Sequence, residues 1–198
     1  MASRIVLHLI RHEKTQANVE RKYIGWTNEP ILKNVQANFH FESSMVYGSD
    51  LKRCEQTALC YFPTAQFIPI TALRELNFGD FEMKTYEQLK DNDIYRHWID
   101  QPFKVTPPNG EDFQTFEQRV LNAVYTIIKQ EGEYTFVVHG GVIRVLLTQL
   151  CFEEKTFQQI QANHRTIYSL TWDRLEHFLG GGKCTSLSEE HITVKESM

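Results

Sequence analysis

The chain of 198 residues lacks any long hydrophobic run, and it has only four cysteines. No apolar stretch approaches the roughly 20 residues that span a bilayer. The apolar segment near the start, in MASRIVLHLIRHEK, is short, contains a histidine and is followed by charges, so we expect no signal peptide. Because the cysteines include no CxxC pair, we expect reduced thiols in a cytoplasmic protein.

The sequence also lacks an excess of positive charge, with 21 Lys and Arg against 25 Asp and Glu. The formal net charge of −4 argues against a surface that binds nucleic acid or an acidic membrane. Any affinity for phosphate must therefore come from a local cluster of cations. We expect neither nucleic acid nor a membrane as a partner, and the sequence leaves the oligomeric state open.

Short aliphatic or β-branched runs alternate with helix-like segments along the chain. The runs that predict strands are RIVLHLI, SMVYGS, QFIPI, YTFVVH and TIYSLTW. Helices are expected over residues 49–62, with Ser49 as N-cap, and over 113–132 and 141–152. This order predicts the α/β class, as a three-layer α/β/α sandwich with a mainly parallel central sheet.

Residues 81–110 interrupt this alternation, because they are polar and aromatic and include the irregular stretch QPFKVTPPNGED. We interpret them as a small inserted helical or loop lobe within a single domain of residues 1–198. The end of the chain, from Asp173, predicts a hairpin strand, a glycine-rich turn and a final short strand or tail.

Three of the predicted strands end in residues suited to chemistry. RIVLHLI is followed by Arg11 and His12, and SMVYGS leads into a helix whose first turn holds Arg53. YTFVVH ends in His139, before a Gly-Gly pair and another helix. Because ligands bind outside the carboxyl ends of strands in open α/β sheets, we expect these side chains to converge. Two guanidinium groups, two imidazoles and exposed amides suit a phosphate dianion.

Each of these residues alone also has a purely structural interpretation. Isolated arginines are usually solvated or paired, and a buried histidine usually just satisfies its hydrogen bonds. His8, which faces the same side of its strand as His12, has no evident role. No Cys or Asp cluster completes a zinc site at these two histidines, so we expect no metal.

Four segments, in order, resemble the motifs of the histidine phosphatase superfamily, the phosphoglycerate mutase-like enzymes. LIRHEKTQAN is similar to LIRHGETxxN, and SDLKRCEQTA to SxLxRxxxTA. LRELNFGDFEM is similar to LxExxxGxxEG, and VVHGGVIRVLL to the second-histidine strand and helix. The resemblance implies catalytic residues His12, Glu75, Arg11, Arg53 and His139, with substrate contacts from Arg11, Arg53, Asn18, Gly25 and Gly140.

The resemblance also implies a role for each side chain. His12 would be the nucleophile that becomes phosphohistidine, and Arg11, Arg53 and His139 would clamp the phosphate without a metal or other cofactor. The arginines should disfavour protonation of His12, which keeps its lone pair available. Glu75 would donate a proton to the leaving group and later act as base. A surface carboxylate at Glu75 and a turn-forming side chain at Asn18 are the structural alternatives.

The chain departs from the family pattern at two places. Glu13 stands where the family has Gly, and Lys14 replaces the usual acidic neighbour. Glu13 would either crowd the pocket or, as we favour, point into solvent with Lys14 offsetting its charge. Met83 follows Glu82 where the family often has Gly. Together with YIGWTNEPI and PPNGEDFQTFEQRV, this variant resembles the α-ribazole phosphatase branch.

The resemblance therefore implies a metal-independent phosphomonoesterase that acts on a small metabolite. The best single substrate is α-ribazole 5′-phosphate, from cobalamin biosynthesis. Broad-specificity hydrolysis of small phosphates and a phosphoglycerate mutase are alternatives, and a catalytically silent phosphate-binding module is an alternative of another class. Five aromatic residues could stack on a ring of the substrate, although such residues more often form core. They are Tyr23, Trp26, Phe81, Tyr95 and Trp98.

Overall fold

The structure is a computed structural model that describes residues 4–33, 35–37, 39, 41–151 and 153–196. A six-stranded sheet in the order β4-β3-β5-β1-β6-β7 forms its centre. The strands β4, β3, β5 and β1 are parallel, whereas β6 joins β1, and β7 joins β6, in antiparallel fashion. The strands are β1 (Ile5–Arg11), β3 (Met45–Gly48), β4 (Gln66–Pro69), β5 (Gly132–Val138), β6 (Thr166–Trp172) and β7 (Ser186–His191).

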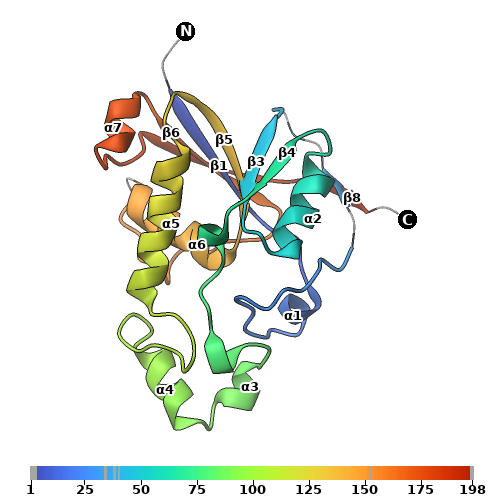
Figure 1. Cartoon of the computed structure of the whole chain (residues 1–198), viewed down its shortest axis with the longest axis vertical. Coiled ribbons are helices and arrows are strands. Elements are labelled where there is room, and N and C mark those ends of the chain that lie inside the picture. Colours follow the sequence, from blue (N-terminus) through green and yellow to red (C-terminus); the bar gives the residue numbers. More distant parts are fainter. Residues whose placement is uncertain (1–3, 34, 38, 40, 152, 197–198) are drawn as a thin grey trace.

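Helices cover both faces of the sheet, which confirms the predicted α/β/α layers (Figure 1). One face packs on α5, α6 and α7, and the other on α2 and a small antiparallel pair, β2 (Val35–Ala37) with β8 (Val194–Glu196). The helices are α1 (Gln16–Val19), α2 (Lys52–Tyr61), α3 (Tyr86–Leu89), α4 (Asp93–Asp100), α5 (Phe113–Ile127), α6 (Gly140–Leu150) and α7 (Leu175–Leu179), with 3₁₀ turns at Thr71–Leu73 and Gly79–Phe81.

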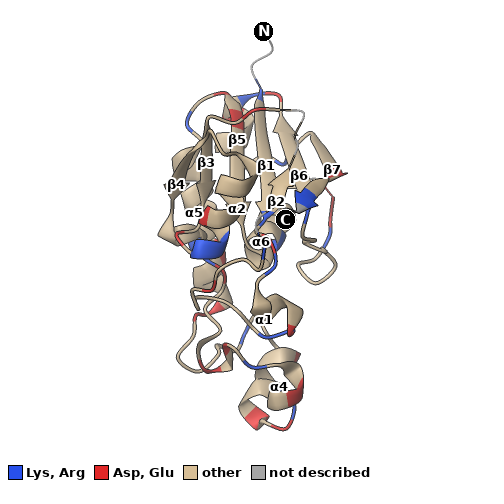
Figure 2. Ribbon diagram, turned by 90° about the vertical axis from the view of Figure 1, so that its right-hand side faces the viewer, with Lys and Arg blue, Asp and Glu red and all other residues tan. Residues whose placement is uncertain are grey.

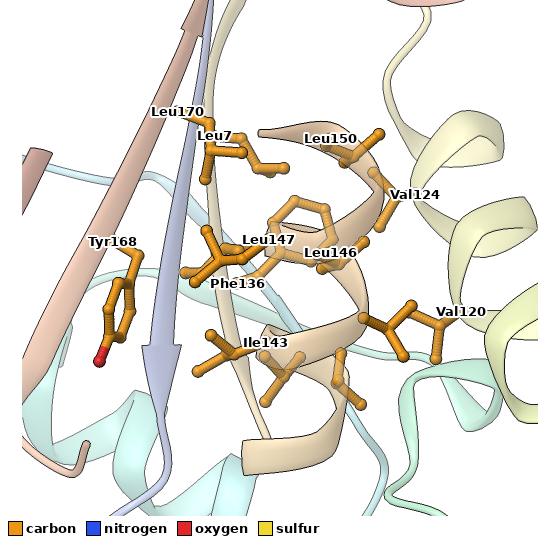
Figure 3. Close-up of a cluster of buried hydrophobic side chains, with 14 of the residues drawn as sticks. Leu7, Val120, Val124, Phe136, Ile143, Leu146, Leu147, Leu150, Tyr168 and Leu170 are labelled. Carbon is orange, nitrogen blue, oxygen red and sulfur yellow. The ribbon is translucent and has the colours of Figure 1, made fainter. Parts of the chain in front are cut away.

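The strand β1 carries buried apolar side chains on both sides because it lies in the middle of the sheet. Leu7 points toward α6, where it lies near Leu170 of the neighbouring strand and Leu150 of the helix (Figure 3). Ile10 belongs to the second core, on the α2 side. Burying each such side chain contributes about 2 kcal/mol. This central packing fixes where β1 ends, and therefore where Arg11 and His12 lie.

Several boundaries differ from those that the sequence predicts. The helix α5 begins after Asp112, whose carboxylate accepts a hydrogen bond from the Thr115 N–H at 2.9 Å, and it ends five residues before Gly132. It ends early because Ile128 turns into extended backbone and buries its side chain completely. The predicted hairpin strand after Asp173 is wrong: the chain forms α7, which buries Phe178 in the core.

The predicted lobe, residues 81–110, contains α3 and α4 and lies at the carboxyl ends of the parallel strands (Figure 1). Its own apolar cluster consists of Phe81, Leu89, Tyr95 and Trp98. Three of the five aromatic residues considered for ring stacking are thus core residues of the lobe. The organisation of the chain as one domain stays a prediction.

The surface carries both signs of charge, and Figure 2 shows Lys and Arg interspersed with Asp and Glu. In the described part of the chain no helix has the length and apolar character that crossing a membrane requires.

Candidate active site

The register of β1 and β5 brings two histidines together. Arg11 pairs with Val138, so the residues that follow, His12 and His139, leave the sheet at the same level. The His12 N–H donates to the Val138 carbonyl at 2.9 Å. The two imidazole centroids consequently lie 5.1 Å apart.

His12 is held as a neutral imidazole with a defined tautomer. Its Nδ1 lies 2.7 Å from the backbone carbonyl of Glu13, and because a carbonyl only accepts, Nδ1 carries the proton. Its Nε2 therefore keeps a lone pair. Burial, followed by the charges of Arg53 and Arg11, holds the pKa of His12 well below its usual value. The expectation that the arginines disfavour protonation is confirmed, although burial is the larger cause.

Arg53 reaches the site from the first turn of α2 and is completely buried. Its two terminal nitrogens donate to the carbonyls of Thr27, at 2.8 Å, and Gly25, at 2.6 Å. A Cβ on Gly25 would lie 2.1 Å from the Leu76 carbonyl oxygen, so only glycine fits there. Gly25, predicted as a substrate contact, positions Arg53 through its carbonyl in this structure.

Arg11 lies against the start of α6. Its Nη1 donates to the Ala162 carbonyl at 2.7 Å. Its Nε is buried and has no hydrogen-bond partner in the part of the chain that the structure describes. A Cβ on Gly140 would lie 3.2 Å from the guanidinium carbon, so the glycine at this position lets Arg11 pass close to the helix.

His139 has both ring nitrogens engaged. Its Nδ1 accepts from Arg53 Nε at 3.3 Å, so Nε2 donates to the Ser49 hydroxyl at 2.7 Å. Burial and then the charge of Arg53 hold the pKa of His139 well below its usual value. The prediction of Ser49 as a helix N-cap is wrong, because α2 begins at Lys52 with Leu51 at the N-cap. The backbone needs two more residues after β3 before it turns into the helix.

Glu75 is buried at the N-terminus of α6 rather than on the surface, with 9% of the residue exposed. One carboxyl oxygen accepts from the Gly141 N–H at 2.8 Å, and the other from the Leu76 N–H at 2.9 Å. These two bonds fix the carboxyl group while leaving further lone pairs on its oxygens. The interpretation of Glu75 as an exposed loop carboxylate is therefore wrong.

Asn18 has a local structural role in α1. Its side-chain oxygen accepts from the Thr15 N–H at 3.1 Å, and the Thr15 hydroxyl accepts from the Asn18 N–H at 3.4 Å. Together these bonds form a capping box around the four-residue helix. The turn-forming alternative describes these contacts, and a substrate contact by Asn18 stays a prediction.

Glu13 does not point into solvent, and Lys14 is not its partner. It is 5% exposed, its carboxylate lies 3.0 Å from Arg165 Nε, and it also accepts a hydrogen bond from the Tyr61 hydroxyl. The Glu13 N–H donates to the Thr57 hydroxyl at 2.8 Å. The expectation failed because Arg165 lies 152 positions away, where no local pattern connects it to Glu13.

His164 is a site residue that the sequence analysis missed. Its Nδ1 donates to the His12 carbonyl at 2.7 Å, and the two rings lie 5.6 Å apart. Burial and then Arg11 lower the pKa of His164 to about 3. It comes from the loop before β6, and only the pairing of β6 with β1 brings that loop to the site. No motif in the sequence marks it.

The geometry agrees with comparisons to known proteins. The model of the histidine phosphatase superfamily (branch 1) matches residues 7–179. The chain belongs to the histidine phosphatase superfamily. It is 32% identical to the adenosylcobalamin/alpha-ribazole phosphatase of Escherichia coli (strain K12), over 73% of this chain and 78% of that one. It is 30% identical to the metal-independent phosphoserine phosphatase of Arabidopsis thaliana, over 72% and 67%.

A solved structure of the same family has the same fold. The crystal structure of the alpha-ribazole phosphatase from Shigella flexneri matches with a TM-score of 0.72 and 26% identity, over 83% of this chain and 89% of that one. The chain is therefore a phosphatase of the histidine phosphatase superfamily, as the motifs predict.

Met83, which stands where the family often has Gly, has a backbone conformation that favours glycine. Met83 adopts φ 61°, the left-handed region in which the family's usual glycine is free of strain. The preceding Glu82 accepts hydrogen bonds from the N–H groups of Trp26 and Thr27, each at 2.7 Å. The turn therefore keeps the loop that supplies two carbonyls to Arg53 in place.

Proposed function

We propose that this phosphatase hydrolyses a small phosphomonoester through a phosphohistidine on His12, and that α-ribazole 5′-phosphate is its substrate. The observation that carries the proposal is the tautomer of His12. Because Nδ1 donates to the Glu13 carbonyl, the lone pair of Nε2 is the free nucleophile. That nitrogen lies among the groups that would bind a phosphate.

In the first step, Nε2 of His12 attacks phosphorus and the bond from phosphorus to the alcohol oxygen breaks. Arg11 and Arg53 stabilise the negative charge on the phosphoryl oxygens, supplying the positive charge that a metal provides in other phosphatases. His139 forms the wall beside His12 and holds Arg53 Nε. The Glu75 carboxyl gives its proton to the leaving alcohol.

In the second step, a water molecule attacks the phosphorus of phosphohistidine. The Glu75 carboxylate takes the proton from that water, and the bond from Nε2 to phosphorus breaks. Phosphate leaves and His12 returns to its neutral form. Glu75 thus regains the proton that it lost in the first step, so one turnover consumes only water and ester.

The choice of substrate rests on the relatives. The Escherichia coli relative is named for α-ribazole phosphatase activity. The loop YIGWTNEPI, which resembles that branch in sequence, carries the Thr27 and Gly25 carbonyls that hold Arg53. We also propose a cytoplasmic location, which the absence of disulfides among the four described cysteines supports. A role in cobalamin biosynthesis follows from the same substrate.

Trapping the intermediate tests this proposal. Brief incubation with a ³²P-labelled phosphomonoester in the presence of chelator should label the protein with acid-labile, base-stable phosphate. His12→Ala should abolish both the label and hydrolysis. Full hydrolysis by His12→Ala would overturn the assignment of the nucleophile.

A substrate comparison separates the alternatives. We expect kcat/KM for α-ribazole 5′-phosphate to exceed that for 3-phosphoglycerate and phosphoserine. Transfer of the label to a second phosphoglycerate rather than to water would instead indicate a mutase. No label with any ester, together with binding of phosphate, would indicate a silent binding module.

A further inference from the structure

A cavity of about 420 Å³ opens beside the catalytic carboxyl that we assign to Glu75. Its lining includes Glu75 and Gly141, the carboxyl and the N–H that it binds. Because Glu75 would protonate the leaving alcohol, that alcohol must lie next to this carboxyl. We call this cavity the leaving-group pocket; its assignment rests on the proposed function.

The leaving-group pocket is mostly apolar and aromatic. Phe103 from the lobe, Phe113 from the start of α5 and Phe157 from the loop after α6 form one side. Their rings meet nearly edge to face, at 4.6 Å between Phe103 and Phe113 and 5.1 Å between Phe113 and Phe157. Phe103 is nevertheless 43% exposed, so this wall leaves aromatic surface open to a ligand.

A single cation lies in this apolar wall. Among the described residues that line the pocket, Arg144 and Glu75 carry the charges. The Arg144 guanidinium carbon lies 5.6 Å from the centroid of the Phe157 ring, and its buried Nε has no hydrogen-bond partner in the described part of the chain. Arg144 follows Gly141 by about one helical turn, on the same helix.

The size and lining of the pocket decide what kind of alcohol fits. A volume of 420 Å³ falls within the range of small-molecule sites, and the alcohol of phosphoserine or phosphoglycerate is too small to cover these aromatic walls. A flat ring would cover them by stacking. A ring beside a guanidinium also gains cation–π attraction, which strengthens where water is excluded.

We propose that Arg144 and Phe157 determine substrate specificity by binding a flat aromatic ring in the alcohol part of the phosphomonoester. Arg144 rests on Phe157 and offers its guanidinium group to the ring. Arg11 and Arg53, in contrast, would contact only the phosphate group, which every phosphomonoester shares. The ring therefore affects affinity and kcat/KM but takes no part in bond making or breaking.

A matched pair of esters tests the subsite. Ethyl phosphate and 2-phenylethyl phosphate are both primary alkyl esters and differ by a phenyl ring. We expect the wild-type protein to show a kcat/KM about thirtyfold higher for the phenylethyl ester, from the apolar area that the ring buries. Arg144→Gln should reduce this preference about fivefold through loss of cation–π contact. Phe157→Leu should also reduce it, because leucine fills the space without a ring face.

Arg4→Gln is the matched control, because Arg4 pairs with Glu133 near the opposite end of β1 and should keep the full preference. An unchanged preference in both pocket variants would overturn the inference while leaving the proposed phosphatase mechanism intact. A stronger preference for phosphoserine that Arg144→Gln abolishes would show a carboxylate subsite instead. If no ester is hydrolysed, the proposed mechanism fails, and calorimetric affinities for the two esters then test the subsite by the same ratio.

Discussion

At the scale of single residues, Glu13 shapes the surroundings of His12, the proposed nucleophile, through contacts with residues behind it. Its carboxylate joins Arg165 from the loop before β6 to Tyr61 at the end of α2. Burial, followed by the hydrogen bond to Glu13, raises the pKa of Tyr61 and keeps it a donor. The ion pair with Arg165 and the hydrogen bond from Tyr61 thus connect the segment that carries His12 to the loop before β6 and to the end of α2.

Glu13→Gly would restore the usual family residue, yet we expect it to lower stability rather than raise the rate. Removing one partner of a fully buried pair costs about 3–5 kcal/mol, and about 2 kcal/mol is expected here because the Arg165 side chain is partly exposed. Urea unfolding measures this change. Lys14→Ala, at the exposed neighbouring position, should stay within about 0.5 kcal/mol. A faster enzyme of unchanged stability would show that Glu13 obstructs the site.

At the scale of elements, the loop between β3 and α2 uses its serine for positioning instead of capping. The buried Ser49 hydroxyl accepts from His139, and His139 in turn accepts from Arg53. This chain of two hydrogen bonds links the ends of β3, α2 and β5. A change in this loop therefore reaches His139 and Arg53, which we propose as phosphate-site residues.

Ser49→Ala should lower kcat/KM about tenfold, because a buried N–H of His139 loses its acceptor and Arg53 loses its fixed partner. Circular dichroism should show the same helix content, since Leu51 and not Ser49 is the N-cap. Ser44→Ala, at the exposed position just before β3 and thus at the end of that strand remote from Ser49, is the control for both measurements. Loss of helix stability with full activity would instead assign Ser49 the capping role.

The elements also show where sequence reasoning succeeds. The apolar runs predict β1, β3, β5 and β6 because a buried central strand needs apolar residues on both faces. Because parallel strands end at the same edge of the sheet, the sequence also predicts that the segments after these strands bring Arg11, His12, Arg53 and His139 close together, as the structure shows. Partners such as Ser49 for His139, and Arg165 for Glu13, depend on register and loop paths that no local pattern encodes.

At the scale of the whole molecule, three neutral histidines meet in the site. Burial is the main cause that lowers the pKa values of His12, His139 and His164. In the unfolded chain each histidine titrates near its ordinary pKa of about 6.5. Below that pH the unfolded state binds more protons than the folded state, so acid favours unfolding.

The free energy of unfolding should therefore stay level above about pH 7 and fall below about pH 6.5, by up to about 1.4 kcal/mol per pH unit for each histidine. Urea unfolding at a series of pH values measures this slope. His164→Gln should reduce the slope, because one proton fewer is taken up on unfolding. A stability that stays constant down to about pH 5.5 would contradict buried neutral imidazoles.

The two arginines of the site are anchored by main-chain oxygens. Arg11 donates to the Ala162 carbonyl, and Arg53 donates to the carbonyls of Gly25 and Thr27. Every amino acid supplies a carbonyl, so the side chains along these loops are free to diverge while the two arginines stay in position, except at Gly25, where only glycine fits. Enzymes built in this way can consequently change the ester that they hydrolyse through substitutions in the loops, while the reaction mechanism stays the same.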